Sequence, residues 1–321
     1  MEHFLSVAKG NIIHFYKGWA CSRVSGLTIK YDLRTNEFDG YSVELKELKN
    51  AIKVLDGKLS IEDGSIYVVS QVGNKKKKLN TTQSSYFEDV DTSIASRVAN
   101  KFYDRFVTAS KYISHDQTRY FLMGICLTEL GGVWATDGRH MIAYHDDENL
   151  ANGVESIISW NSVLSKLKVE SIFRHDNSME FVTVQGVHYF AEFLKGKFPN
   201  CKRLLEDSSS FRPIILSKKV CESLMFAEKF ISDKQNIAKV NSKGIETLDD
   251  NPYSDKWEIE ELFEFACNLY CLNRCVSDIN IENFSSYTLV GAKRMMFKNE
   301  SSKIFFEDAE KVTMLMPFVK H

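Results

Sequence analysis

Two segments about 118 residues apart in the chain are nearly identical. The first, Lys111 to Gln117, reads KYISHDQ, and the second, Lys229 to Gln235, reads KFISDKQ. An alanine stands two places before each of them. Recurrence at a long spacing indicates that one structural unit is built more than once. We therefore expect the same elements, in the same order, around both copies.

A predicted amphipathic helix precedes each copy. Apolar residues recur there at intervals of three and four, which places them on one helical face. Ser93 or Ser96 is the expected N-cap of the first helix, and Ser217 is that of the second. The two apolar stripes are Val98, Phe102, Phe106 and Ala109, and Val220, Leu224, Ala227 and Ile231.

Strand-like segments with turn residues follow both copies, which predicts a β-hairpin after each helix. The expected turns are Gly131-Gly132 and Ser242 to Gly244. The segment Lys9 to Gly18 resembles Lys234 to Gly244. A third hairpin is therefore expected near the N-terminus, with its preceding helix shortened or lost.

A second unit, a helix followed by a hairpin, also recurs three times. The sequence therefore predicts an α+β fold of three similar domains, at residues 1–90, 91–210 and 211–321, with antiparallel sheets and helices. The helices of the second unit are expected to begin near Ser42, Asn161 and Asn268, and their hairpins to turn at Asp63-Gly64, Gln185-Gly186 and Gly291-Ala292.

The composition is ordinary for a soluble globular protein, with 44% apolar and 26% charged residues. No apolar run reaches about 18 residues, and the N-terminus lacks a signal-peptide layout, so we expect no membrane contact and no export. Seven cysteines fit reduced thiols in the cytoplasm. Because the net charge is −2, a surface for nucleic acid would have to gather positive charge locally.

Basic residues lie on one face of several predicted helices and are the DNA-facing candidates. A single stripe is often just a solvated helix face. Stripes on equivalent helices of a repeat favour a shared surface that meets phosphates without reading the base sequence. The candidates are Lys46, Lys49, Lys53, Arg97, Lys101, Arg105, Lys218 and Lys219.

Several motifs resemble the bacterial beta-type DNA polymerase sliding clamps. Arg119-YFLMGICL followed by Val133-WATDGRHMIAY resembles the middle domain of that family, and Gly196-KFPNCKRLL resembles its GRFPDYRRVLP segment. Met314-LMPFVKH is similar to the family's C-terminus. The resemblance implies a DNA clamp fold in which two three-domain chains form a ring, with helices lining the hole and sheets outside. It implies a non-enzymatic processivity factor that tethers the replicative polymerase to double-stranded DNA.

The resemblance also implies a pocket between the second and third domains for short peptides of the polymerase, the clamp loader and repair proteins. Methionine and leucine suit a slot that adapts to varied peptides. The sequence has Arg139-His140 where the family usually has His-Arg, which leaves the polar lining open. Carried over by motif, the pocket residues are Leu122, Thr136, Gly138, Arg139, His140, Met141, Pro199, Arg203, Leu204, Met314, Leu315, Met316, Pro317 and Phe318.

A homodimer seam is implied as well, and its candidates are Lys77, Leu79, Phe230 and Ile231. The run Lys75 to Lys78 stands where the family has an apolar edge, and lysines on an edge discourage strand pairing. The run is either a solvated turn or part of a charged seam against Glu258, Glu260 and Glu261. The shortened first domain and the divergence suggest a phage-encoded clamp, located in the host cytoplasm.

Other motifs are set aside. Cys267, Cys271 and Cys275 have the spacing of a buried helical stripe, and His140 and His145 lack the spacing of zinc ligands, so no metal or cofactor is expected. Two alternative functions stay open. One is a clamp-like regulator of replication proteins that does not close a ring, and the other is a nucleic-acid-processing enzyme that uses Asp137 and His140.

Overall fold

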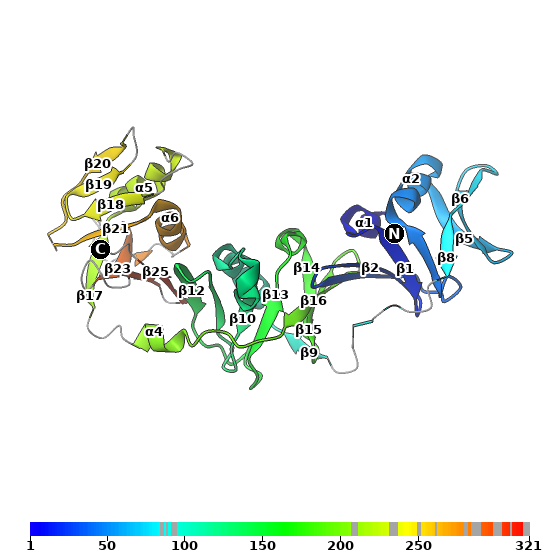
Figure 1. Ribbon diagram of the computed structural model, residues 1–321, viewed down its shortest axis with the longest axis horizontal. Helices are drawn as coiled ribbons and strands as arrows, with labels where there is room; N and C mark the ends of the chain where they lie inside the picture. Colours follow the sequence, from blue (N-terminus) through cyan, green and yellow to red (C-terminus); the bar gives the residue numbers. More distant parts are fainter. Residues whose placement is uncertain are drawn as a thin grey trace. The chain divides into compact units, whose positions relative to one another are not determined.

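The computed structural model has two compact units. Unit 1 consists of residues 1–103 and 158–194, and unit 2 consists of residues 104–157 and 195–321. Each unit combines short helices with antiparallel strands, which confirms the predicted α+β class (Figure 1). The structure describes residues 1–83, 87, 89–90, 95–206, 211–230, 237–248, 252–260, 262–278, 282–283, 290–297, 304–308 and 310–316.

Unit 1 begins with a short helix and contains most of the strands of the first half of the chain. Its elements are α1 (Glu2–Val7), β1 (Ile12–Tyr16), β2 (Trp19–Val24), β3 (Leu27–Asp32), β4 (Tyr41–Glu44), α2 (Leu45–Leu55), β5 (Gly57–Glu62), β6 (Ser65–Ser70), β7 (Lys76–Lys78), β8 (Thr81–Gln83), β9 (Ser96–Val98), the 3-10 helix η3 (Ser162–Lys166), β14 (Val169–Arg174), β15 (Ser178–Thr183) and β16 (Val187–Leu194).

The chain passes between the units at α3 (Lys101–Ala109) and β13 (Ser156–Ser159). The elements of unit 2 are η1 (Ser110–Tyr112), η2 (Gln117–Leu122), β10 (Gly124–Leu127), β11 (Val133–Thr136), β12 (His140–Tyr144), α4 (Lys202–Glu206), β17 (Arg212–Leu216), α5 (Lys218–Ala227), η5 (Glu228–Phe230), β18 (Ile237–Asn241), β19 (Gly244–Thr247), β20 (Ser254–Lys256), β21 (Glu264–Asn268), α6 (Leu269–Ser277), β22 (Glu282–Asn283), β23 (Val290–Phe297), β24 (Ile304–Glu307) and β25 (Lys311–Leu315).

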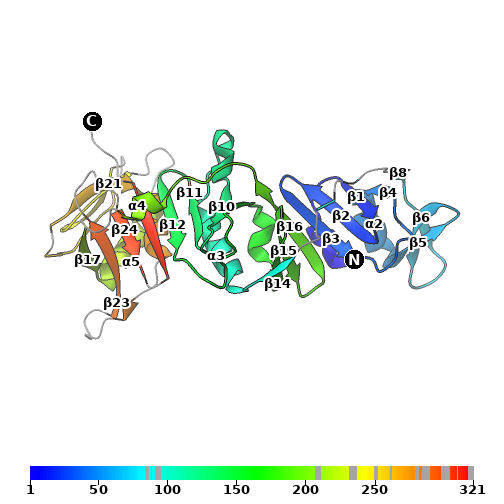
Figure 2. The same cartoon turned by 90° about the horizontal axis from the view of Figure 1, so that it is seen from below.

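In unit 1, strand β16 extends the sheet that the N-terminal strands form. β1, β2 and β3 are consecutive antiparallel neighbours, and β16 pairs with the outer side of β3, with Val187 opposite Tyr31 and Ala191 opposite Leu27 (Figure 2). Ile29 and Tyr189, which are opposite each other, are fully buried. This strand pair joins segments on either side of the predicted boundary near residue 90.

Unit 2 repeats this arrangement with other strands. β10, β11 and β12 are consecutive antiparallel neighbours, and β25 pairs with β12 from Tyr144–Lys311 to His140–Leu315 (Figure 1). The pair joins segments on either side of the predicted boundary near residue 210. A separate four-stranded sheet runs in the order β20-β19-β18-β21. The division of the chain into three domains stays a prediction.

Several local predictions are confirmed. Ser217 caps α5, because its side chain accepts a hydrogen bond from the Val220 N–H, and Asn268 caps α6 in the same way. Asp63-Gly64 is the turn between β5 and β6, and both residues have positive φ angles of 46° and 69°, as the primed hairpin turns require. Gly186 lies in the turn between β15 and β16.

Other local predictions are wrong. The helix before the first copy begins at Lys101, because residues 96–98 form strand β9, in which Val98 pairs with Ile172 of β14. A distant strand therefore overrides the local helical pattern. Ser96 is consequently not an N-cap, and Ser93 lies outside the described residues.

The helix before the first hairpin is shortened, as expected, because α1 has six residues. Two further corrections concern a helix and a turn. The helix near Asn161 is the 3-10 helix η3. Gly291-Ala292 lies inside β23, where Ala292 pairs with Glu282, so it is not a turn. None of the helices in the described part of the chain combines the length and the apolar character needed to cross a membrane.

Candidate functional site

The loop between β11 and β12, together with the adjoining ends of both strands, carries five of the predicted pocket residues, and Asp137 holds the loop in shape. The Asp137 carboxylate accepts hydrogen bonds from the backbone N–H groups of Arg139 (2.8 Å) and His140 (2.9 Å) and from His140 Nδ1 (2.9 Å). The Thr136 hydroxyl donates to the His140 carbonyl (2.8 Å) and accepts from the Gly138 N–H (3.0 Å). The loop is thus fixed by its own side chains.

The burial of His140, and not its bond to Asp137, argues against a hydrolytic pair. Burial acts to raise the pKa of Asp137, but hydrogen bonds from His140 and Arg139 lower it below its usual value. The His140 side chain is only 2% exposed, and its ring packs against Tyr112 at 4.7 Å between centroids. This carboxylate and imidazole therefore act as a structural clip for the loop.

Gly138 is needed for its backbone conformation. Its φ of +88° is in the left-handed region, and a Cβ at this position would lie 3.2 Å from Arg119 Nη1. Arg119 thus reaches the loop from η2, and its side chain is 56% exposed. In the sequence Arg119 stands only at the start of a family motif, and no local pattern marks it as a residue of the site.

The pairing of β12 with β25 brings the two halves of the predicted pocket together. Met141 lies opposite Met314, His140 lies opposite Leu315, and the Met316 N–H donates to the Arg139 carbonyl at 2.9 Å. Leu122, Met141, Met314 and Leu315 are all buried, whereas Gly138, Arg139 and Met316 are exposed. The apolar members therefore form a packed base, and the exposed members form a rim.

The remaining pocket candidates lie on the segment that carries α4. Pro199 and Arg203 are exposed, and Leu204 lies in α4. Pro199 lines a cavity of about 670 Å³ that the sequence motifs do not predict. The GKFPN motif predicts that this segment belongs to the site. It does not predict that Trp134 of β11 lines the same cavity. The candidates Pro317 and Phe318 lie outside the described residues.

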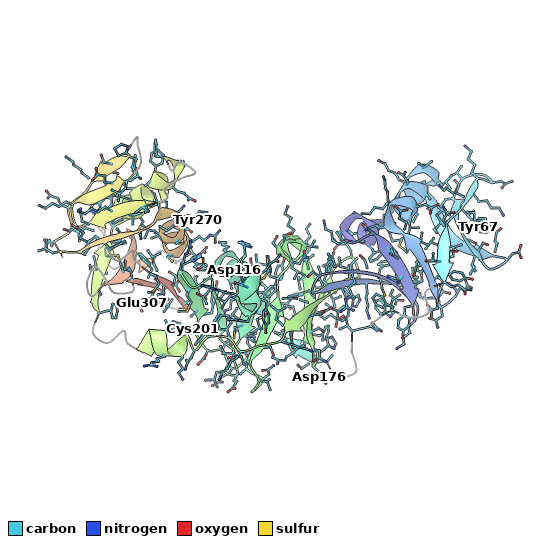
Figure 3. All side chains as sticks on the ribbon, in the orientation of Figure 1. Tyr67, Asp116, Asp176, Cys201, Tyr270 and Glu307 are labelled. Carbon is cyan, nitrogen blue, oxygen red and sulfur yellow. The ribbon has the colours of Figure 1, made fainter. Side chains whose placement is uncertain are left out.

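The walls of the cavity beside α4 include both basic residues, such as Lys197, and acidic residues, such as Glu155. Cys201, at the start of α4 (Figure 3), is buried, and burial raises the pKa of its thiol to about 11, so it is a poor nucleophile. The lining residues include Thr128, Leu130, Trp134, Tyr144, Glu155, Lys197, Phe198, Pro199, Lys202 and Leu205.

The first copy of the repeated segment packs against α6. The Tyr112 hydroxyl donates to the Arg274 carbonyl at 3.1 Å, and Lys111 Nζ lies 2.5 Å from Asp278 Oδ1. Cys267, Cys271 and Cys275 are all buried, but Cys267 lies in strand β21, so only Cys271 and Cys275 belong to a helical stripe. No group of three or more metal-ligating side chains suited to an ion occurs within the described ranges.

Five of the eight DNA-facing candidates are exposed on helices. Lys46 and Lys53 are exposed on α2, Lys101 begins α3, and Lys218 and Lys219 begin α5; Lys49 is half-buried on α2. Two candidates differ from the expected exposed helical placement. Arg97 is exposed but lies in strand β9, and Arg105 is paired with Asp147 at 2.9 Å with its side chain only 15% exposed.

The four candidates for the homodimer seam differ in their exposure to solvent. Lys77 lies in β7, which ends a three-stranded sheet, so the run of lysines is a strand and not a turn. Leu79 is 1% exposed and therefore cannot meet a partner. Phe230 is 47% exposed, and Ile231 lies outside the described residues.

Comparison with solved structures gives matches over the whole chain. The DNA polymerase sliding clamp of Pseudomonas aeruginosa has a TM-score of 0.78 at 15% identity, covering 99% of this chain and 97% of that one. The clamp of Bacillus subtilis has a TM-score of 0.77 at 14% identity, with 100% and 96% covered. The DNA polymerase III beta subunit of Thermotoga maritima has a TM-score of 0.73 at 16% identity, with 100% and 97% covered.

No protein-family model matches the chain, and no curated protein sequence matches it either. The similarity is thus one of structure, and it confirms the predicted DNA clamp fold.

Proposed function

We propose that the chain is a DNA polymerase sliding clamp, a ring-shaped homodimer that encircles duplex DNA and tethers the replicative polymerase. The observation that carries the proposal is the match to sliding clamps over 99% of this chain and 97% of a solved clamp. A closed ring holds DNA topologically, so neither a tight DNA site nor a catalytic group is needed. A phage origin rests on sequence divergence alone.

The exposed lysines of α2, α3 and α5 suit this function. Lys46, Lys101 and Lys219 stand on helices and are exposed. Flexible ammonium groups attract phosphates at any position along DNA, which permits sliding without a sequence preference. The net charge of −2 keeps the rest of the surface from binding DNA strongly.

The partner-peptide site of the proposed clamp lies where the C-terminal strand meets the β11–β12 loop. Met316 supplies an exposed apolar side chain, and Arg119 and Arg139 supply cations for a carboxylate or carbonyl of the peptide. The buried Met141 and Met314 beneath can shift to admit an apolar side chain, since methionine is flexible. The polymerase and the clamp loader are the proposed partners.

Retention on DNA of different topology tests the clamp function. The protein would be loaded by its clamp loader onto nicked circular DNA, and half of the sample would then be linearised with a restriction enzyme. We expect retention on the circle and loss from the linear DNA through its free ends. Equal retention on both would contradict encirclement.

Removal of residues 316–321 tests the peptide site. The Met316 N–H bond to Arg139 and the exposed methionine are lost, while β25 stays complete. We expect polymerase binding to be abolished and the circular dichroism spectrum and the melting temperature to change little. Unchanged polymerase binding by the truncated chain would disprove the assignment of the site.

The lysines of β7 favour one other candidate, a clamp-like regulator that binds replication proteins as a monomer. Lysine side chains on an edge strand oppose pairing with another strand. Light scattering at micromolar concentration separates the two candidates, because the clamp predicts twice the chain mass of 36.8 kDa. A stable monomer would favour the regulator.

A further inference from the structure

A cavity of about 600 Å³ in unit 1 shares no residue with the sites described above. Its lining residues come from the N-terminal helix α1, from the 3-10 helix η3 and the segment after it, and from strands β15 and β16. All of these elements belong to unit 1, in which α1 and β16 can be located in Figure 1. The cavity is therefore formed within one compact unit.

The charged side chains that line this cavity are basic. Lys9, Lys166 and Lys168 line it and are exposed, whereas none of its lining residues in the described part of the chain is acidic. The other cavities differ, because Asp32 lines a second cavity of unit 1 and Glu155 lines the cavity beside α4. The whole chain has a net charge of −2. Three lysines around one cavity therefore create a local site that attracts anions.

Tyr189 supplies a hydrogen-bond donor that the fold leaves unused. It lies on β16, lines the cavity and is fully buried, and its hydroxyl has no hydrogen-bond partner among the described residues. Burial raises the pKa of this hydroxyl to about 12, so it is protonated and able to donate at neutral pH. Buried polar groups without a partner are rare in folded proteins and call for an explanation. An oxygen atom of a bound ligand would give this hydroxyl its partner.

Tyr103 holds the segment that carries two of the lysines. Its hydroxyl donates to the Leu164 carbonyl at 2.7 Å and accepts from the Leu167 N–H at 2.9 Å. Leu164 is fully buried, which anchors η3 on the core of the unit. Lys166 and Lys168 therefore extend from a backbone whose shape is fixed before any ligand arrives. A preformed site of this kind loses less entropy when it binds a ligand.

Lys9 and Thr183 are held in place by other hydrogen bonds of the unit. The Lys9 N–H donates to the Ser22 hydroxyl at 3.1 Å, and this hydroxyl donates in turn to the Lys9 carbonyl. The Thr183 hydroxyl, which also lines the cavity, donates to the Val187 carbonyl at 3.1 Å and accepts from the Val187 N–H at 3.2 Å. Thr183 is thus satisfied within the protein, and the buried donor that remains for a ligand is that of Tyr189.

We propose that this cavity binds the phosphate group of a free small molecule of about the size of a mononucleotide. Ammonium groups form strong, charge-assisted hydrogen bonds with phosphate, and the Tyr189 hydroxyl adds a neutral donor. The volume of about 600 Å³ lies within the range of roughly 300–1,000 Å³ that is usual for small-molecule sites. Val7, Val163 and Leu167 also line the cavity and offer apolar surface to the rest of the molecule. This site goes beyond the clamp function and does not depend on it.

The arrangement favours a free phosphomonoester over the backbone of DNA. A phosphate in DNA is a diester with a single negative charge, whereas a phosphomonoester carries about two at neutral pH. Three lysines around one cavity match this larger charge, which is concentrated at one point. Tyr189 is fully buried, and a small molecule enters a recess more easily than a phosphate that is fixed in a double helix.

Titration calorimetry of the full chain without DNA, in a phosphate-free buffer of low salt, tests the site. Adenosine 5′-monophosphate (AMP) carries a phosphomonoester, adenosine carries no phosphate, and a dinucleoside monophosphate carries a phosphodiester as DNA does. We expect AMP to bind and inorganic phosphate to compete with it, and we expect no binding of adenosine. The diester should bind roughly tenfold more weakly than AMP, because it has lost one negative charge. Absence of AMP binding, equal binding of adenosine, or equal binding of the diester would each overturn the proposal, and the last would assign the cavity to DNA.

The variant Tyr189→Phe removes only the unpaired hydroxyl. Because no hydrogen bond within the described part of the fold is lost, we expect the melting temperature of the ligand-free protein to stay the same or to rise. The affinity for AMP should fall roughly tenfold, since a hydrogen bond to a charged group is lost. A hydroxyl that only fills space would leave this affinity unchanged, and that result would overturn the proposed site.

A pair of lysine variants locates the bound phosphate. Lys166→Gln with Lys168→Gln should weaken AMP binding roughly tenfold or more, because two charge-assisted contacts are lost. The control, Lys53→Gln with Lys58→Gln, removes the same charge from two exposed lysines of unit 1 outside this cavity, and Lys58 lines the second cavity of the unit. We expect the control to bind AMP as the natural chain does. An equal loss in both variants would show a response to overall charge alone and would overturn the assignment to this cavity.

Discussion

Glu180 is a buried carboxylate that holds two histidines in unit 1. His175 Nε2 donates to Glu180 Oε2 at 2.8 Å, and His188 Nδ1 donates to Oε1 at 2.6 Å. Burial acts to raise the pKa of Glu180, but these hydrogen bonds outweigh it and lower the pKa to about 2 from 4.5. His188 lies on β16, opposite Lys30, so the cluster supports the strand pair that β16 makes with β3.

The substitution Glu180→Gln should therefore reduce the free energy of unfolding at pH 7 by roughly 2–3 kcal/mol. Because the folded-state pKa is depressed, the contribution of Glu180 is complete above about pH 4.5 and is lost as the pH falls through about 2. Urea unfolding between pH 7 and pH 2 measures it. Glu170→Gln, an exposed change on β14, should cost nothing measurable. A pH-independent difference between Glu180→Gln and the natural chain would contradict the prediction.

Gly138 offers a residue-scale test of the peptide site. Gly138→Ala should cost roughly 1–2 kcal/mol, because a Cβ at a positive φ is strained. It should also weaken polymerase-peptide binding, since the new Cβ displaces Arg119. Gly186→Ala has the same type of strain, with φ +69° and no atom within 4 Å, and it should leave peptide binding unchanged. Fluorescence anisotropy with a labelled peptide compares the two, and equal affinities would remove Arg119 from the site.

Arg105 shows what could not be predicted from the sequence for a single residue. Its helical position beside Lys101 was correct, but its partner, Asp147, lies 42 residues away in another segment. Such an ion pair could not be predicted from the local sequence, because neither residue spacing nor composition shows which distant segments lie together in the fold. In contrast, the turn at Asp63-Gly64 was predictable, since its chemistry is contained in two adjacent residues.

At the scale of elements, the hairpins and caps followed from local sequence, while the long-range strand pairs did not. The helical stripe over residues 98–109 was correct for α3 but extended too far, because β9 gains backbone hydrogen bonds from β14. The partnership of β12 with β25 was implied for the site only through family resemblance. The pairing of strands is decided by packing between distant segments, which the period of a single strand cannot specify.

The exposed starts of α3 and α5 give an element-scale prediction. Lys101 and Lys219 occupy matching positions of the two repeated helices. Changing both to alanine should reduce the salt dependence of DNA binding, with the slope of log K against log salt falling by about 1 for each lost phosphate contact. Titrations at salt concentrations from about 50 mM to about 200 mM measure this slope. Lys58→Ala with Lys195→Ala, two exposed lysines outside the helices, should leave the slope unchanged.

At the scale of the whole molecule, the two seams of the proposed ring decide how long it stays on DNA. In a head-to-tail pair, each copy supplies one half of each of two seams, so the proposed ring closes after two copies. A head-to-tail contact that did not close after two copies would instead produce filaments. Closure of the proposed ring is therefore tested by joining both seams covalently.

The proposed dimer should, after loading on nicked circular DNA and treatment with a reducible bifunctional amine reagent, remain on that DNA in sodium dodecyl sulfate. Denatured but covalently closed chains still encircle the circle, because release would need a broken covalent bond. Linearising the DNA, or adding a reductant, should free them. A loaded sample that is not cross-linked should be released by the detergent alone. If the cross-linked dimer left circular DNA in detergent although the gel showed both seams joined, the chains would be linked beside the DNA and not around it.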